Sequence, residues 1–196
     1  MLGKVKTRLA KSIGDIGAFE VYKGLVDITE TETKKMTNCN IRVYFSDVVI
    51  ESKWSDCEKY VQEGIGLGMR MENAFKEGFA DGYEKVILIG SDLPDLKAEL
   101  INESFNNLDH FDVVLGPAED GGYYLIGMSS QKDFIFRNKS WSTEKLLEQT
   151  MTELDKKEIS YHLLDQLNDI DTLEDLLNSD VSAKFKHLYE LPRSNK

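Results

Sequence analysis

The sequence predicts an α/β domain with a doubly wound, mainly parallel sheet. Short apolar runs alternate along the chain with amphipathic segments of helical periodicity, which is the order of elements in βαβ units. The strongest run, Lys85–Ile89, is almost continuously apolar, as is typical of a strand covered on both faces. A chain of 196 residues is long enough for one such domain and hardly for two, so we expect a single domain over residues 1–196.

Five apolar runs are predicted to be strands. In chain order they are residues 41–45, 85–89, 111–115, 123–126 and 160–164. The fourth run follows the third after a short turn that contains glycines, so we expect it to be antiparallel or to lie at an edge of the sheet.

Helices are predicted where apolar residues recur at helical spacing. These segments are residues 18–28, 71–79, 97–108, 143–157 and 172–177. The signals are weak from about residue 179 onward. We expect this last segment to be peripheral, either frayed or folded as a short helix.

Composition limits the kinds of partner. A net charge of −11 argues against nucleic acid, because phosphate backbones recruit basic faces. No apolar run approaches the roughly 18–20 residues of a membrane span. Cys39 and Cys57 lack CxxC spacing and are expected to be free thiols in a reducing compartment. We therefore expect a cytoplasmic protein, a monomer or a dimer, that acts on small molecules.

A basic loop, Gly3–Arg8, opens the chain. It combines three cations and a hydroxyl with a glycine, ahead of a helix. Positive charge together with exposed backbone N–H groups can bind phosphates at such a position. The alternative is a solvated basic N-terminus.

A second polar loop, Gly90–Pro94, directly follows the strongest strand. Ligands of open α/β sheets bind at the carboxyl ends of the strands. The carboxylate of Asp92 could therefore hold a divalent cation against phosphate oxygens. Asp92 could equally cap the following helix.

The third loop, Gly116–Tyr124, contains the sequence Asp120-Gly121-Gly122. Paired glycines let a backbone approach a ligand closely, and the carboxylate could bind a hydroxyl group or a metal ion. An Asp-Gly-Gly hairpin turn needs no ligand, and spacing alone favours the turn.

The fourth loop, Asn168–Asp175, carries Asp169 and Asp171 in an extended segment. We expect only one of these two carboxylates to reach a given site. Asp171 could form a capping box with Glu174. If Thr172 and Asp175 cap the helix instead, Asp171 is free to bind a ligand.

Two other features are weaker. Gly64–Gly68, ahead of Arg70, is rich in glycine but lacks the GxGxxG order. Trp141-Ser142-Thr143 places two hydroxyls at the start of a predicted helix, which is typical of a cap. The three histidines share no metal-ligand spacing.

Six segments, taken in order, resemble the bacterial family DUF2064. They are GKVKTRL, QEGIGLGMRM, GSDLP, GPAEDGGYYLIG, WST and NDIDTLEDL. This family is described as glycosyltransferase-A-like or nucleotide-diphospho-sugar-transferase-like. The resemblance extends from Gly3 to about Leu177. The chain is also distantly similar to phospholactate and molybdenum-cofactor guanylyltransferases, and Lys6–Leu9 resembles the Lys-Ser/Thr-Arg-Leu run of the former.

The resemblance implies a role for each segment. Mg²⁺ or Mn²⁺ is expected on Asp92 and Asp171, with Asp169 in reserve, and Lys6, Arg8 and Asp92 are the expected catalytic residues. Nucleotide-binding roles are implied for Gly3, Lys4, Lys6, Thr7, Arg8, Gly68, Arg70 and Ser91. Substrate-binding roles are implied for Asp120, Gly121, Gly122, Tyr123, Trp141, Ser142 and Thr143, the first four of them for the acceptor.

Members of this family carry a hydrophobic strand before the basic loop, whereas the present sequence starts at that loop. We expect the functional polypeptide to start upstream, or the chain to be truncated. Addition of the first strand should then raise thermal stability.

The leading hypothesis is a Mg²⁺-dependent nucleotidyltransferase that acts on a small phosphorylated or carboxylated acceptor and releases pyrophosphate. The basic loop favours it, since a triphosphate needs more countercharge than a sugar diphosphate. The alternative is a glycosyltransferase with a nucleotide-sugar donor, although GSDLP has one aspartate rather than a DxD pair. A nucleotide-binding protein without catalysis is the second alternative.

Overall fold

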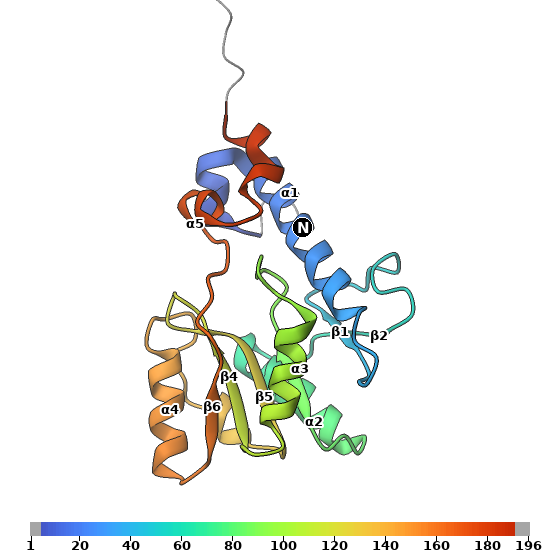
Figure 1. The fold of residues 1–196 in the computed structure, drawn as a ribbon, viewed down its shortest axis with the longest axis vertical. Helices are drawn as coiled ribbons and strands as arrows, with labels where there is room; N and C mark the ends of the chain where they lie inside the picture. Colours follow the sequence, from blue (N-terminus) through green and yellow to red (C-terminus); the bar gives the residue numbers. More distant parts are fainter. Residues whose placement is uncertain (1–4, 191–196) are drawn as a thin grey trace, which may run out of the picture.

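The structure is a computed structural model that describes residues 5–190. A four-stranded sheet lies at its centre in the order β3–β5–β4–β6 (Figure 1). Its strands are β3 (Val86–Ile89), β4 (Val113–Pro117), β5 (Tyr123–Met128) and β6 (Tyr161–Leu163). A separate parallel pair consists of β1 (Arg42–Phe45) and β2 (Glu58–Val61).

The predicted antiparallel strand is confirmed. β5 runs antiparallel to both of its neighbours, β3 and β4, whereas β4 and β6 are parallel. Consequently β3, β4 and β6 share one direction, as a mainly parallel sheet requires. β5 lies inside the sheet rather than at its edge, because the short turn after β4 returns the chain beside β4 and β3 pairs with the other side of β5.

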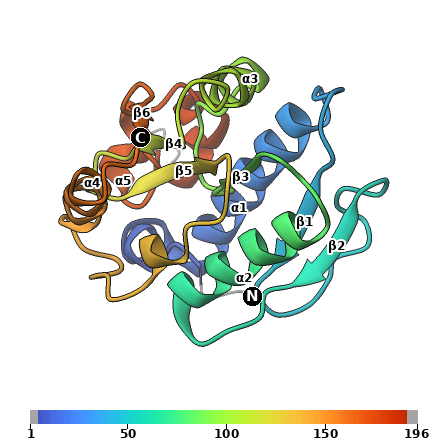
Figure 2. The ribbon, with the colours of Figure 1, turned by 90° about the horizontal axis from the view of Figure 1, so that it is seen from below.

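Helices cover both faces of the sheet, which confirms the doubly wound arrangement. α2 (Gly66–Ala80) and α4 (Leu146–Lys156) pack on one face together with Val113 and Leu115. α3 (Ala98–Asn107) packs on the other face with Val114. This alternation along β4 follows from the two-residue period of a strand. Figure 2 shows α2 and α3 on opposite sides of β5.

α1 (Thr7–Thr33) is much longer than the predicted helix over 18–28. Its first part carries a weaker apolar pattern and is separated by a kink at Gly14, where φ is 76° and ψ is 163°. In the described part of the chain, no strand precedes this helix.

A third cluster of apolar side chains joins the first helix to the last helical elements of the described residues. Leu9 and Leu25 of α1 pack there against α5 (Leu173–Asn178) and Phe185 of the short helix η2 (Ser182–Leu188). These elements lie together above the sheet in Figure 1. The segment after residue 179 is therefore not wholly peripheral, because Phe185 is buried.

Two short elements are absent from the sequence prediction. β2 has two charged residues among its four, so it lacks an apolar run and is defined by pairing with β1. The helix η1 (Asp133–Phe136) places Ile135 and Phe136 in the core. Among residues 5–190 no helix combines the length and the apolar character needed to cross a membrane. Cys39 and Cys57 are free, as predicted.

Candidate functional site

Lys6 immediately precedes α1 and has a left-handed backbone, with φ 49° and ψ 47°. This conformation is uncommon for a residue with a Cβ atom, and such strain is retained only where the surroundings impose it. Leu9, one turn into the helix, is fully buried and anchors this end of α1. The start of the helix is thereby fixed with the Lys6 side chain directed at the sheet loops.

The Lys6 side chain lies among three aspartates, and we call these four residues the Lys6 cluster. Its Nζ is 3.0 Å from Asp92 Oδ2 and 3.0 Å from Asp171 Oδ1. Asp169 Oδ2 is 3.8 Å from the same Nζ. Asp92 follows β3, and both other aspartates follow β6, so the carboxyl ends of two parallel strands supply the acids.

The expectation that only one of Asp169 and Asp171 could reach a site is wrong. Both carboxylates lie within 4 Å of the Lys6 ammonium. Residues two apart in extended chain point to the same side, so this spacing brings them together rather than apart.

Local structure holds the acids in place. A Cβ on Gly90 would lie 2.9 Å from Asp92 Oδ1, so a glycine here leaves room for that carboxylate. Thr172 and Asp175 form the capping box of α5. Asp175 also accepts a hydrogen bond of 3.0 Å from the backbone N–H of Asp171. The capping alternative that leaves the Asp171 carboxylate free is therefore confirmed.

Charge in the Lys6 cluster is unbalanced, since three carboxylates surround one ammonium. Burial by itself lowers the pKa of Lys6, whose side chain is 5% exposed, but Asp92 and Asp171 outweigh burial and raise it. Burial raises the pKa of Asp169 to about 6, with a further contribution from the charge of Asp92. The cluster therefore has an excess of negative charge in a half-buried position.

The rest of the basic loop lies at the surface or outside the described residues. Gly3 and Lys4 fall outside them. Thr7 and Arg8 are exposed, and Arg8 Nη1 is 3.9 Å from Asp171 Oδ2. Arg8 thus adds a second cation at the solvent side of the cluster.

The Asp-Gly-Gly segment forms the turn that its spacing favoured. Asp120 Oδ1 accepts a hydrogen bond of 2.8 Å from the Gly122 N–H. Gly121 has φ 84°, and a Cβ there would lie 2.2 Å from the Glu144 carbonyl oxygen. The Glu119 N–H, next to Asp120, donates to the Leu167 carbonyl at 3.1 Å, so this turn adjoins the segment that carries Asp169 and Asp171.

Trp141 links α2 to the turn. A Cβ on Gly68 would lie 2.5 Å from the Trp141 Nε1, and the Tyr123 ring meets the Trp141 ring edge-on at 6.5 Å between centroids. The Tyr123 hydroxyl is buried without a hydrogen-bond partner among the described residues, and burial raises its pKa. Gly68 is therefore required for packing, whatever else it contacts.

The remaining predicted residues have other partners, or none, among the hydrogen bonds and ion pairs of the described residues. Arg70 donates to the Gly64 carbonyl at 3.3 Å and to Gln62 Oε1 at 3.2 Å, so it holds its own loop. Thr143 donates to the Ser140 carbonyl at 2.7 Å within a turn. Ser91 is half-buried, and Ser142 is exposed. Within residues 5–190 none of these side chains forms a hydrogen bond or ion pair with the cluster.

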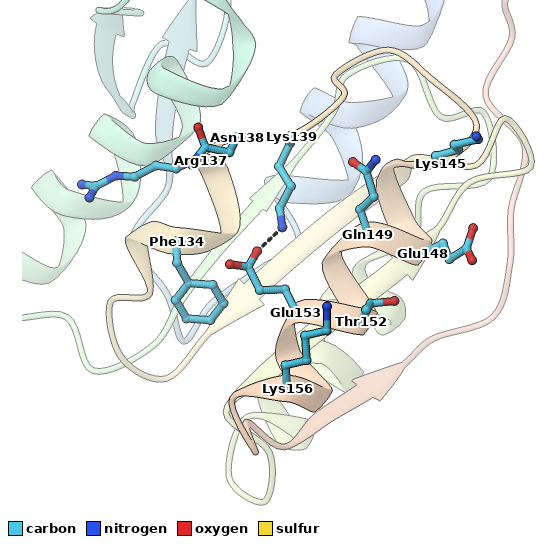
Figure 3. Close-up of a pocket in the computed structure, with 10 residues that line it drawn as sticks. All are labelled: Phe134, Arg137, Asn138, Lys139, Lys145, Glu148, Gln149, Thr152, Glu153 and Lys156. Carbon is cyan, nitrogen blue, oxygen red and sulfur yellow. Dashed lines mark hydrogen bonds and ion pairs between the residues drawn. The ribbon is translucent and has the colours of Figure 1, made fainter.

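A polar groove of about 740 Å³ lies elsewhere, between α4 and the segment after η1 (Figure 3). Lys139 points across it to an ion pair with Glu153, and Arg137 pairs with Glu72 at 2.7 Å. None of the predicted site residues lines this groove. The groove is therefore separate from the residues that the sequence singles out.

No three His, Cys, Asp or Glu side chains in the described part of the chain are arranged to hold a metal ion by themselves. The three aspartates share the Lys6 ammonium instead. Sequence reasoning assigned no role to Gly90. Its signal was available, because a glycine directly after the strongest strand adjoins the candidate ligand Asp92.

Comparison with known proteins gives three kinds of match. A family model described as "Uncharacterized protein conserved in bacteria (DUF2064)" matches residues 30–143. The 2-phospho-L-lactate guanylyltransferase of Methanocaldococcus vulcanius is 27% identical over 128 residues, which are 63% of this chain and 57% of that protein. The protein of the same name from Methanocaldococcus sp. FS406-22 is 31% identical over 114 residues, which are 57% of this chain and 47% of that protein. The chain thus spans about half the length of these curated relatives.

A crystal structure covers more of the chain. It is of a Desulfovibrio desulfuricans G20 protein provisionally named a nucleotide-diphospho-sugar transferase. The TM-score is 0.84 at 26% identity, over 98% of this chain and 94% of that one. The similarity in fold therefore extends through the loops that carry the Lys6 cluster.

Proposed function

This chain belongs to the DUF2064 family, and we propose on that premise that it is a nucleotidyltransferase. It would transfer a nucleoside monophosphate from a nucleoside triphosphate to a small phosphorylated or carboxylated acceptor. Two similarities support a transferase. The curated relatives are named guanylyltransferases, and the similar solved structure is named a nucleotide-diphospho-sugar transferase. The guanylyltransferases are matched over only about half of their length. The proposed donor and acceptor are therefore argued from the residues of the site.

The single observation that carries the proposal is the Lys6 cluster. A cation from the basic loop lies 3.0 Å from acids that follow two parallel strands of the sheet. Such strand ends are where open α/β sheets bind their ligands. The cluster therefore offers both a countercharge for phosphates and acids for a cation.

The acids fit Mg²⁺ or Mn²⁺. Mg²⁺ is commonly bound by one or two protein carboxylates together with substrate phosphates and water, so a complete protein cage is not required. Asp92 and Asp171 would hold it, with Asp169 beside them, and the excess negative charge of the cluster favours a divalent ion. When bound, this ion would reduce the charge repulsion between the phosphates and the acceptor.

The protein's own residues would act by position and charge. An acceptor oxygen forms a bond to the α-phosphorus while the bond from that phosphorus to the bridging oxygen breaks, and pyrophosphate leaves. Lys6 and Arg8 would neutralise the charge that grows on the leaving group. A phosphate or carboxylate acceptor already has an ionised oxygen, so no general base is needed.

The second candidate is a glycosyltransferase that uses a nucleotide sugar. The name of the Desulfovibrio desulfuricans relative favours it. The two functions differ in their product, since a nucleotidyltransferase releases pyrophosphate and a glycosyltransferase releases a nucleoside diphosphate from such a donor.

The test measures both products. The protein is incubated with Mg²⁺ and either GTP and ATP or a panel of nucleotide sugars, with phosphorylated and carboxylated acceptors. Pyrophosphate release that Asp92→Asn lowers at least about a hundredfold is expected. Asp165→Asn is the control, because Asp165 is an exposed acid that follows β6 and forms no ion pair with Lys6, so this variant should keep its activity.

Release of nucleoside diphosphate from a nucleotide sugar, without pyrophosphate from any triphosphate, would establish the glycosyltransferase instead. Tight nucleotide binding without turnover on any acceptor would favour the protein without catalysis.

A further inference from the structure

Lys6 occupies the position that a cation bound to the three aspartates would need. Its Nζ lies 3.0 Å from Asp92 and from Asp171, and 3.8 Å from Asp169. The Lys6 side chain is 5% exposed, whereas those of Asp92 and Asp171 are about 40% exposed, at 42% and 41%. The ammonium therefore lies beneath acids that remain open to solvent on their other side.

A divalent cation and an ammonium cannot share these acids at low cost, because like charges at such distances repel. If the cation arrives alone, Lys6 loses its partners while most of its side chain is buried, and an unpaired buried charge is strongly unfavourable. If the cation arrives with a triphosphate, the phosphate oxygens give the ammonium new partners.

We propose that Lys6 acts as an internal competitor for the cation, so that the site takes up a divalent ion with a nucleoside triphosphate and only weakly without it. This inference rests on the proposed function, because it assumes that the acids bind the cation and that the basic loop binds phosphates. It makes Lys6 the positioning residue that couples the two ligands, in addition to its contact with the phosphates.

Reciprocal coupling follows from this competition. A nucleotide that draws Lys6 away from the acids strengthens cation binding, and the cation strengthens nucleotide binding by the same factor. Without Lys6 the acids are free at all times, so the cation would bind more tightly by itself and the coupling would fall.

The experiment measures Mn²⁺ binding to the free protein by electron paramagnetic resonance, with MnCl₂ as the only ligand. Lys6→Met is expected to bind Mn²⁺ at least about tenfold more tightly than the unchanged protein. Lys6→Gln removes the charge but keeps a polar side chain, and it should shift affinity in the same direction. Circular dichroism confirms that each variant is folded.

Lys139→Met is the matched control. Lys139 is also nearly buried, at 3% exposed, and forms an ion pair, but its partner is the single carboxylate of Glu153. Its removal frees one acid rather than three, so Mn²⁺ affinity should equal that of the unchanged protein. A gain in Lys139→Met as large as in Lys6→Met would show a general charge effect and overturn the inference.

A second measurement repeats the titration with GTP or ATP. The unchanged protein is expected to gain Mn²⁺ affinity with nucleotide, and Lys6→Met to gain at least about fivefold less. If Lys6→Met and Lys6→Gln bind free Mn²⁺ no more tightly than the unchanged protein, the inference fails, whatever the nucleotide does. If Lys6→Met binds Mn²⁺ tightly but no nucleotide binds either protein, the competition stands and the proposed function fails.

Discussion

At two positions near the sheet, the backbone conformation requires a glycine. Gly66 and Gly121 both have positive φ, 80° and 84°, where only glycine is free of strain. Their surroundings differ, because the Cα of Gly66 faces open space and that of Gly121 faces the backbone of Glu144. The two positions therefore separate backbone strain from a steric clash.

Gly121→Ala should lower the free energy of unfolding by about 1–3 kcal/mol more than Gly66→Ala. Both variants incur the strain of a left-handed alanine, about 1–2 kcal/mol. Only Gly121→Ala also forces a Cβ to within 2.2 Å of the Glu144 carbonyl oxygen, which is backbone and cannot move aside easily. Urea denaturation measures the free energy of unfolding of both variants. Equal losses of stability would contradict the close packing of Gly121 on the Glu144 backbone.

Glu30 makes the stability of the fold depend on pH in the acid range. Burial opposes its charged form, but hydrogen bonds from Lys34, the Trp54 N–H and Lys53 outweigh burial and lower its pKa from 4.5 to about 2. A depressed carboxylate pKa stabilises the fold above the unfolded value and loses that effect as pH falls through the folded value. Its contribution is therefore present above pH 4.5 and declines towards pH 2.

Glu30→Gln should lower stability at pH 7 by about 1.5–3 kcal/mol, since hydrogen bonds to a charged group are lost. The difference from the unchanged protein should shrink as pH falls from 4.5 towards 2. The midpoints of urea denaturation of both proteins, recorded at pH 7 and across this range, measure the difference. A difference that stays constant with pH would show that the Glu30 charge has no part in it.

At the scale of elements, helix ends connect packing to the site. α5 is only six residues long, and its capping box joins Thr172 to Asp175 through both side chains. Asp175 also binds the backbone N–H groups of Asp171 and Thr172, at 3.0 and 2.7 Å. The same carboxylate thus caps the helix and orders the segment that presents Asp171.

Thr172→Ala should lower the free energy of unfolding by about 1 kcal/mol, because the N-cap oxygen is lost. Thr31→Ala is the control, since Thr31 is exposed and its hydroxyl binds only the Asp27 carbonyl one turn earlier in α1. Its effect should stay within about 0.5 kcal/mol. Urea denaturation compares the two variants, and similar losses would show that the capping box adds no stability.

At the scale of the whole molecule, α1 packs against α5 and η2, which lie far from it along the chain. Phe185 is 2% exposed and packs with residues of α1 and α5. A Cβ on Gly24 would lie 2.5 Å from the Phe185 ring, so the aromatic side chain lies directly on α1. This packing fixes the direction of the helix that begins beside Lys6.

Phe185→Ala should lower the free energy of unfolding by about 3–5 kcal/mol, the usual cost of deleting a buried aromatic ring. Leu177→Ala is the control, because Leu177 lies in neighbouring α5 but is 48% exposed. Thermal and urea unfolding measure both. A loss below about 1 kcal/mol for Phe185→Ala would mean that the C-terminal segment is peripheral after all.

Much of the fold could be predicted because it depends on the spacing of apolar residues and glycines within a few positions. The apolar runs at Val86–Ile89 and at Phe111–Leu115 gave the strands β3 and β4, and the short glycine turn gave the antiparallel direction of β5. The Thr172–Asp175 capping box was one of two readings of its segment. β2 could not be found in this way, since Glu58–Val61 has no apolar pattern of its own and depends on its partner strand.

From residue order alone, most of the strands, helices and polar loops could be predicted in sequence, together with the kinds of side chain that each loop carries. Those features depend on residue spacing within a few positions. Lys6 meets Asp92 and Asp171, which are 86 and 165 positions away along the chain, through folding in three dimensions. The same is true of the approach of Asp169 to Lys6 and of the packing of Gly68 on Trp141. Contacts at such separations result from the packing of α1 against α5 and η2, which no local pattern encodes.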